Sequence, residues 1–385
     1  MTSVAALPAE LAELFDGELA PTVRRMGERP LGGGPVADEQ AAARAAVWAT
    51  LAETGVFDEV VDGTQAPGDL VRLGEAMGRA LYRGPYLDTA AAVELITALD
   101  AHTDEVFADV LDAVADGAGA IALAPRAEGT DDPYDPSPLT TGDGPDGPWV
   151  SGRRRFVAFA DAVDWLLVVG TDSATEAEAG TGTGTGAGTV LALVRADDPG
   201  VTLRRHDDIS RGDLHCVDLH RVPLYGGRPI GSGAPAEAAW HRALATLRVR
   251  HAATLTGQAQ GALVLGVERA KSRVQFGQPL ARHQSVAFTL AALSARITAV
   301  RSLVEETARG LDRDPHGPGS RLAVLQTLAL AAGLVRDAAA QCLHLHGAHG
   351  MTEDADSQLY FRRAALDALL WGSPAQLWAR AATLL

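Results

Sequence analysis

The chain has 385 residues, of which 47% are hydrophobic and 21% charged, and its formal net charge is −16. The length fits two or three packed units, and the composition is ordinary for a soluble globular protein. The acidic balance and the absence of a long lysine or arginine run disfavour nucleic-acid binding, although a few local arginines could still bind a polyphosphate.

Targeting and redox signals are weak. The first ten residues have no basic region before an apolar stretch, and the apolar run from Val324 to Val335 is too short to span a bilayer. We therefore expect a cytoplasmic protein without a membrane segment. Cys216 and Cys342 form no CxxC pair and lie in apolar segments, which predicts buried, inert thiols.

The first hundred or so residues predict helices. Leu11, Leu14 and Phe15 recur at helical spacing, and Gly55 and Pro85 are suited to end helices. Further helices are expected over residues 38–54, 68–81 and 89–99.

The pattern changes near Gly117 to short apolar runs bounded by Gly, Pro and Asp, which predict β-strands. Residues 133–148 are rich in turn residues and predict a long connection. Strands are expected over residues 120–124, 156–160, 165–169, 189–194 and 214–219.

From about Ala236 to the end, the apolar period is helical again. The predicted architecture is mainly α with a central β-domain, divided into an N-terminal helical domain (1–114), a middle β-domain (115–230) and a C-terminal helical bundle (231–385). The bundle helices are expected over residues 243–272, 284–310, 321–346 and 359–371, with a last helix at the end of the chain.

The stretch Gly180–Gly188 contains a GxGxxA pattern, which is typical of dinucleotide-binding loops. Such a loop should follow a strand and begin a helix, so that the helix N-terminus faces the pyrophosphate. This stretch instead precedes the predicted strand at 190–194. We interpret it as a low-complexity insertion in a β-turn.

Two polar clusters are weaker signals. His344, His346 and His349 lie near Glu353 but surround glycines at the end of a predicted helix, so we expect no metal site there. The triplet 153–155, three arginines, is either a solvated strand end or a phosphate contact, and the sequence leaves both open.

The joint between the first two long C-terminal helices carries a more specific pattern. Arg273 and Phe276 are followed by Gly277, Pro279 and then Gln284. A helix terminus with Gly and Pro is a common turn, but an Arg and a Gln placed here could hold an anionic ligand between helices.

This joint resembles the R-x-x-F-G-x-P-[IL]-x-x-x-Q motif of the acyl-CoA dehydrogenase family. A second family motif, Q-x-x-G-G-x-G-[FYM]-T, resembles residues 344–352 here. The resemblance covers essentially the whole chain. It implies an N-terminal helical domain, a middle β-barrel domain and a C-terminal four-helix bundle, assembled as a dimer or tetramer.

The resemblance also implies a function, namely α,β-dehydrogenation of an acyl-CoA thioester with FAD, followed by electron transfer to an electron-transfer flavoprotein. In the family, FAD lies between subunits. Arg273 and Gln284 would contact its ADP portion, Phe276 belongs to the same motif, and the loop His344–Ala348, with Gly347, would donate backbone N–H groups. Thr130 would serve as a flavin contact in the β-domain.

The chain departs from the family pattern where the catalytic base is expected. That position holds Trp371, whose indole has one N–H donor and no basic lone pair. The alternative position on the earlier long helix falls at about Leu247, so no catalytic residue is assigned. In the flavin-binding motifs, Ala124 replaces a threonine, and His344 and Ala348 replace a glutamine and a glycine.

Our leading hypothesis is the subunit of a heteromeric acyl-CoA dehydrogenase that lacks the glutamate and pairs with a homologous subunit that bears it. An alternative is a self-sufficient flavoenzyme with a different base, for which Glu353, Asp354 and Asp367 are candidates. A repurposed flavoenzyme such as a monooxygenase, and a flavin-free scaffold, are further alternatives.

Overall fold

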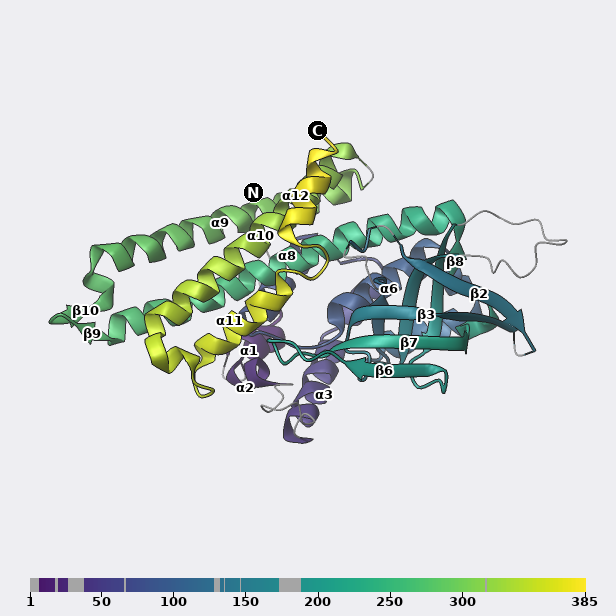
Figure 1. Ribbon diagram of the computed structural model, residues 1–385, viewed down its shortest axis with the longest axis horizontal. Coiled ribbons are helices and arrows are strands. Elements are labelled where there is room, and N and C mark those ends of the chain that lie inside the picture. The colour runs from purple at the N-terminus through teal and green to yellow at the C-terminus, as the bar shows by residue number, and fades with distance from the viewer. Residues whose placement is uncertain are drawn as a thin grey trace.

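The computed structural model describes residues 7–17, 20–26, 38–65, 67–127, 132–134, 136–145, 147–172, 188–315 and 317–385. A helical unit at each end of the chain packs against a β unit formed by the middle of the chain (Figure 1). The predicted succession of helices, sheet and helical bundle is confirmed.

The N-terminal unit is helical, as the apolar spacing predicts, and Gly55 takes a left-handed φ of 74° between two of its helices. The helices predicted over 38–54, 68–81 and 89–99 are all present, and the last begins three residues early because Pro85 occupies its N-cap. The elements are α1 (Ala9–Asp16), α2 (Ala20–Arg25), α3 (Asp38–Glu53), α4 (Val56–Val61), α5 (Pro67–Arg79), α6 (Tyr86–Ala98), η1 (Ala101–Thr103) and α7 (Glu105–Ala115).

The start of α6 is hydrogen-bonded to the first strand, β1 (Ile121–Ala124). The Thr89 hydroxyl bonds both the N–H and the carbonyl of Ile121 at 3.1 Å, and the Asp88 carboxylate accepts the N–H of Leu123 at 3.1 Å. These bonds satisfy backbone groups of β1 and fix the helical unit against the sheet.

The β unit is one mixed sheet in the order β6-β7-β3-β2-β4-β5-β8, with β1 parallel to β4. Apolar side chains such as Val150, Leu166 and Val217 are fully buried in its core. The other strands are β2 (Pro138–Gly144), β3 (Gly147–Ala158), β4 (Trp165–Asp172), β5 (Thr189–Arg195), β6 (Val201–Arg205), β7 (Leu214–Pro223) and β8 (Gly231–Ser232), with the short helix η3 (Tyr225–Gly227) after β7.

Strand β2 corrects one prediction, because it lies within the segment that was expected to be a long connection. It pairs antiparallel with β3, with Thr140 opposite Ser151. A side chain at Gly142 would place Cβ 2.5 Å from the Trp149 ring, so the glycine that suggested a turn in fact makes room for that ring. Residues 180–187 of the Gly-Thr stretch lie outside the described residues, and the strand predicted after them is β5.

The C-terminal unit is built on three long helices that run side by side in Figure 1. The helices predicted for this unit are confirmed. The elements are α8 (Gly233–Ser272), β9 (Val274–Gln275), β10 (Gln278–Pro279), η4 (Leu280–Arg282), α9 (Gln284–Arg313), α10 (Pro318–His346), η5 (Gly347–Met351), α11 (Asp356–Asp367) and α12 (Pro374–Ala382).

By length and hydropathy alone, α9 and α10 could each cross a membrane. The expectation from the sequence concerned only the run 324–335, which is too short, whereas the complete helix α10 is long enough. In the fold, α10 is mostly buried and packs on α8, α9, α11 and α12. Cys216 and Cys342 are buried and free, as predicted, and burial raises the pKa of the Cys342 thiol to about 12.

Candidate functional site

The turn between α11 and α12 places Trp371 where two cavities approach each other. Trp371 has a left-handed φ of 62° and Gly372 a φ of 126°. Ser373 then begins α12 with a capping box, in which its side chain and that of Gln376 bond each other's backbone N–H groups. A non-glycine residue in the left-handed region is uncommon and often marks a functional site.

Neither expected position of the base carries a carboxyl group in the fold. The Trp371 indole packs against both large hydrophobic cores, and Leu247 on α8 is fully buried in the N-terminal core. No proton acceptor stands at either place.

One cavity, of about 340 Å³, lies between α8, the start of α10, α12 and the segment 132–134; we call it the arginine cavity. Its volume is in the range of small-molecule sites, roughly 300–1,000 Å³. None of its described lining residues is acidic. The polar side chains that line it are Tyr134, His241, Arg242, Arg248, Arg321, Arg380 and Thr383.

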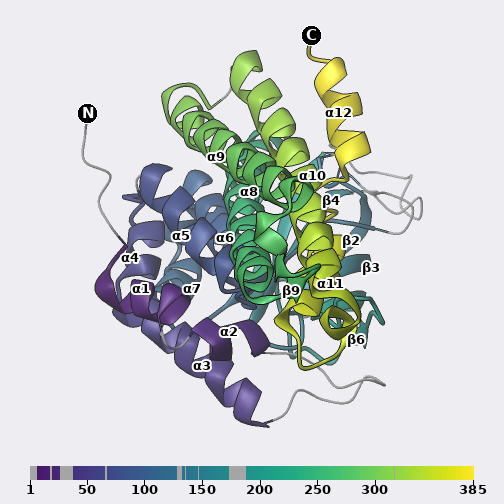
Figure 2. The same cartoon turned by 90° about the vertical axis from the view of Figure 1, so that its left-hand side faces the viewer.

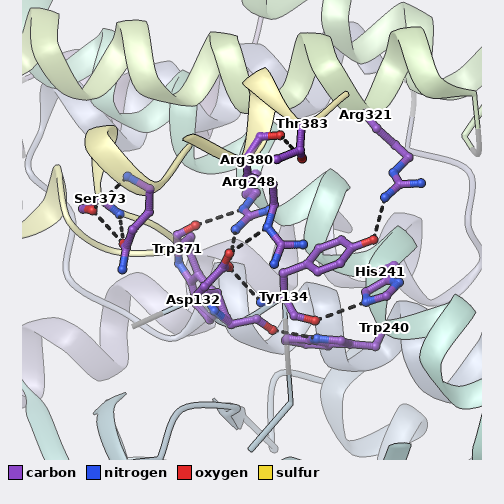
Figure 3. A network of polar contacts seen from close by, with 12 residues as sticks. Asp132, Tyr134, Trp240, His241, Arg248, Arg321, Trp371, Ser373, Arg380 and Thr383 are labelled. Atoms are coloured by element: carbon purple, nitrogen blue, oxygen red, sulfur yellow. Dashed lines mark hydrogen bonds and ion pairs between the residues drawn. The ribbon is translucent and has the colours of Figure 1, made fainter. Parts of the chain in front are cut away.

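The arginines of this cavity are held by a connected network (Figure 3). Asp132 accepts from Arg248 at 3.1 Å and pairs with Arg380 Nε at 2.9 Å. Arg248 Nε also donates to the Trp371 carbonyl at 2.9 Å, which ties the cavity to the Trp371 turn. Two guanidinium groups therefore share the Asp132 carboxylate.

Tyr134 organises the other side of the arginine cavity. Its ring stacks on His241 with centroids 3.8 Å apart, and the Arg380 guanidinium lies 3.9 Å from the ring centroid. Arg321 donates to the phenol oxygen at 2.7 Å. Burial lowers the pKa of Arg248 to about 10, although Asp132 acts in the opposite direction. Arg248 therefore stays protonated near neutral pH, and a cavity lined by guanidinium groups suits an anionic ligand.

The second cavity, of about 120 Å³, lies on the other side of the Trp371 turn, between the α5–α6 connection, the sheet, α8 and α11; we call it the Trp371 cavity. Its wall is largely apolar, with Leu87, Leu123, Phe156 and Phe159 among the lining residues. Its polar or titratable lining residues are Tyr82, Arg83, Asp88, Ser210, Asp213, His251, Thr254, Arg363 and Asp367.

Of the three alternative bases, only Asp367 lines the Trp371 cavity. Asp367 is paired with Arg363 at 3.5 Å and accepts from Gln258. Glu353 pairs with Arg211 at the surface, with 56% of its side chain exposed, and Asp354 is also exposed. The structure thus separates two of the candidates from the cavity.

Asp88 is a cavity residue that the sequence did not single out. In the sequence, Asp88 is an acidic residue in the first turn of a helix, where the helix dipole favours negative charge. Such residues are common and do not by themselves indicate a site. Burial raises its pKa to about 7, opposed by the hydrogen bond from Leu123. Only its tertiary position, under the sheet and 6% exposed, distinguishes it.

The residues predicted to bind nucleotide lie at the far end of the bundle from the sheet. Arg273, Phe276 and Gln284 flank the β9–β10 hairpin, and all three are exposed, Phe276 to 93% (Figure 1). Phe276 and Gly277 take left-handed φ values of 54° and 77° to form the tip of the hairpin. The side chains of Arg273 and Gln284 form no hydrogen bond or ion pair within the described part of the chain.

The second predicted motif lies at the same end of the bundle in Figures 1 and 2. His344 lies in the last turn of α10, and Gly347 and Ala348 begin η5; all three are exposed. Gly347 has a φ of 62° with open space around it, so its backbone is accessible to a ligand. Thr130 lies outside the described residues, and Ala124 is fully buried in β1.

The other polar clusters have structural roles or none. No group of three or more His, Cys, Asp or Glu able to hold a metal occurs in the described ranges. Arg154 is fully buried and donates to the carbonyls of Ser137 and Val169 at 3.1 Å, so it is not available to a phosphate. Arg153 pairs with Asp218 at the surface.

Comparison with known proteins agrees with this geometry. Residues 238–382 match the family described as acyl-CoA dehydrogenase, C-terminal domain. The chain is 36% identical to the acyl-CoA dehydrogenase IpdE2 of Mycobacterium tuberculosis over 135 aligned residues. This alignment covers 35% of this chain and 40% of that protein. The structure matches a variant of the Tcur3481–Tcur3483 steroid ACAD with a TM-score of 0.75 and 26% identity, over 97% of each chain. Residues 238–382 are therefore similar to the C-terminal domain of acyl-CoA dehydrogenases, and the whole chain shares the fold of a solved acyl-CoA dehydrogenase.

The fold is also similar to that of a chain in the ChsE4–ChsE5 complex of Mycobacterium tuberculosis, with a TM-score of 0.74 and 19% identity over 98% of this chain and 97% of that chain. The aligned region spans about two fifths of the length of the curated acyl-CoA dehydrogenases that the chain matches in sequence. Two of the departures from the family pattern lie close together, because Trp371 lines one cavity with Leu123, the neighbour of Ala124.

Proposed function

We propose that this chain takes part in the α,β-dehydrogenation of an acyl-CoA thioester as the subunit without the usual glutamate, and that it completes the FAD site of a homologous subunit that has one. One contrast carries the proposal. Trp371 and Leu247 leave both base positions empty, whereas Arg273 and Gln284 are exposed and unpaired at the far end of the bundle.

The arginine cavity supports a CoA ester as the ligand. Arg248, Arg321 and Arg380 converge on a cavity of about 340 Å³, and none of the described residues that line it is acidic. Planar guanidinium groups bind phosphates through paired, charge-assisted hydrogen bonds. The Trp371 carbonyl accepts a hydrogen bond from Arg248 and lies between the arginine cavity and the largely apolar Trp371 cavity. An acyl-CoA ester fits this arrangement, because its phosphate groups need cations and its acyl group needs an apolar pocket.

The residues at the hairpin fit a role toward FAD in a neighbouring subunit. Arg273 offers a free guanidinium, Gln284 a free amide, and Gly347 an accessible backbone, all at one end of the bundle. Bound FAD would supply the hydride acceptor of the reaction. Because these groups lie at the end of the bundle opposite to the sheet (Figure 1), away from the chain's own cavities, they would serve another chain.

Apolar side chains around the hairpin support burial against such a neighbour. Phe276 is 93% exposed, Val274 53% and Phe288 64%. Exposed aromatic and aliphatic residues next to unpaired polar groups are typical of a protein interface. The names of two matched structures, a steroid ACAD with two components and the ChsE4–ChsE5 complex, agree with a heteromeric partner. We further propose an electron-transfer flavoprotein as the electron acceptor.

Purification of the chain alone and together with a co-encoded homologue tests this proposal. We expect the chain alone to retain little flavin, and the pair to co-purify with flavin and to oxidise an acyl-CoA. A flavin-bound homodimer that oxidises acyl-CoA without any partner would contradict the heteromeric role while leaving the reaction class intact. Flavin-dependent oxygen consumption without acyl-CoA would instead indicate a monooxygenase.

A further inference from the structure

Asp88 stands out among the carboxylates of the Trp371 cavity because no cation neutralises it. Asp213 pairs with Arg44 at 3.0 Å and Asp367 with Arg363 at 3.5 Å. Asp88 has one hydrogen bond, from the Leu123 N–H, and no ion pair within the described residues. Its residue exposure is only 6%.

The bond to Leu123 does not by itself explain an acid at this position. A neutral amide or hydroxyl would accept the same N–H, as the adjacent Thr89 does for Ile121. A buried carboxyl costs free energy unless it gains further polar partners. Its second oxygen therefore calls for a hydrogen-bonding group that enters the cavity with a ligand.

The hydroxyl of Tyr82, in the same wall of the cavity, also lacks a hydrogen-bond partner within the described residues. This hydroxyl is buried, and Tyr82 lines the Trp371 cavity with Asp88. Buried polar atoms without partners are uncommon in native proteins and call for an explanation such as a ligand.

The chemistry of this wall favours a hydroxyl over an ammonium group. A hydroxyl donates to a carboxylate and accepts from a carboxylic acid, so it suits Asp88 in either protonation state. An ammonium would require the ionised form and would lie in a cavity also lined by Arg83 and Arg363. The volume of about 120 Å³ sets the size. A dry cavity of about 150 Å³ accommodates benzene, so this one suits an acyl group of roughly four to six carbons.

We infer that the Trp371 cavity selects acyl-CoA thioesters whose short acyl group carries a hydroxyl, and that Asp88 is the residue that recognises this hydroxyl. The inference rests on the proposed function for the CoA thioester and goes beyond it in naming the acyl group. Removing the hydroxyl would leave Asp88 buried without a second partner, which is how a polar site rejects an apolar analogue.

The test is a titration of the full-length chain with CoA, butyryl-CoA, 3-hydroxybutyryl-CoA and 4-hydroxybutyryl-CoA, followed by calorimetry. We expect one hydroxybutyryl ester to bind at least about tenfold more tightly than butyryl-CoA, the gain of one hydrogen bond to a charged group. In Asp88→Leu, which is similar in size but apolar, this preference should fall below about twofold.

A matched control separates recognition from the attachment of α6 to β1. Thr89→Val removes the neighbouring hydrogen bonds to the same strand and leaves Asp88 in place, so it should keep the preference. If Asp88→Leu does not fold, Asp88→Asn keeps an acceptor for Leu123. In the native chain the preference should increase as pH rises through about 7, because a carboxylate accepts more strongly than an acid, and in Asp88→Asn it should not change. The other titratable groups that line the cavity are Tyr82, Arg83, Asp213, His251, Arg363 and Asp367.

The outcomes distinguish this inference from the proposed function. Equal affinity for butyryl-CoA and both hydroxybutyryl esters in the native chain would overturn the inference alone. Loss of the preference in Thr89→Val as well as Asp88→Leu would also overturn it, because recognition would then depend on the attachment of α6. Failure of every CoA compound to bind would contradict the acyl-CoA assignment and, with it, the substrate named here.

Discussion

At the scale of single residues, the Trp371 turn is held in place by groups other than its own side chain. Arg248 fixes the Trp371 carbonyl, and a Cβ on Gly372 would lie 2.9 Å from Leu377. The left-handed φ of Trp371 therefore follows from its surroundings, which over-determine an uncommon backbone conformation. A substitution of the indole changes the chemistry of the cavity without changing the path of the chain.

Trp371→Glu is expected to add little dehydrogenase activity. The variant places a carboxyl at the usual position, but Ala124 still stands where the family pattern has a threonine. We expect a gain far below the ~10²–10⁴-fold that a positioned base contributes. Turnover of an acyl-CoA with an artificial electron acceptor measures it, and a gain in that range would show that only the base is missing.

Asp88→Asn is expected to stabilise the fold at alkaline pH. Burial raises the pKa of Asp88 from 3.8 to about 7, so the folded chain holds a proton that the unfolded chain has released between these values. The contribution of Asp88 to the free energy of unfolding is therefore greatest below pH 4. It falls by on the order of 4 kcal/mol as pH rises toward 7. The amide has no such loss.

Unfolding of the native chain and of Asp88→Asn by urea at pH 5 and pH 8 measures this difference. The gain in the free energy of unfolding should be larger at pH 8. A gain that is the same at both pH values would show that the Asp88 carboxyl does not titrate differently in the folded and unfolded chain.

At the scale of elements, α5 and α8 make a close contact that depends on two glycines. A Cβ on Gly78 would lie 1.9 Å from the Thr254 carbonyl oxygen, and a Cβ on Gly257 would lie 2.0 Å from the Glu75 carbonyl oxygen. The backbones of the two helices are thus in direct contact. This contact positions the α5–α6 connection, whose residues line the Trp371 cavity.

Gly78→Ala is therefore expected to destabilise the chain by about 3 kcal/mol or more, because backbone atoms cannot move aside as a flexible side chain can. Gly333→Ala in α10 is the matched control. No atom lies within 4 Å of its added Cβ, and the higher helix propensity of Ala should stabilise that variant by ~1 kcal/mol. Thermal unfolding of the two variants measures both effects, and equal changes would contradict the close contact.

Elements with a long, regular apolar period could be predicted from the sequence, and those defined by pairing could not. The helices from α8 to α10 follow directly from their periodicity, whereas β2 is hidden by Gly142, Gly144 and Pro138, which indicate a turn until Trp149 is seen to need the space. Cavities are harder still, because the Trp371 cavity joins residues from positions 82 to 371. Asp88 lacks a motif for this reason: its role depends on contacts that are distant in sequence.

At the scale of the whole molecule, the two ends of the bundle are chemically different. The end near the sheet carries both cavities, and the opposite end carries the exposed hairpin with Arg273 and Gln284 (Figure 1). A chain of this shape cannot bring its hairpin to its own cavities without unfolding α8. If the hairpin binds FAD as we propose, that function therefore requires a second chain.

The double variant Arg273→Ala, Gln284→Ala tests that requirement in the assembled complex. Because both side chains are exposed and bond nothing within the described residues, the melting temperature of the variant chain alone should equal that of the native chain. The complex with the glutamate-bearing homologue should retain less flavin, as measured by its visible absorbance. Arg309→Gln, an exposed substitution toward the other end of α9, is the matched control and should leave the flavin content unchanged. Full flavin retention in the double variant would mean that the hairpin does not contact the nucleotide, and the exposed Phe276 would then indicate an interface without a cofactor.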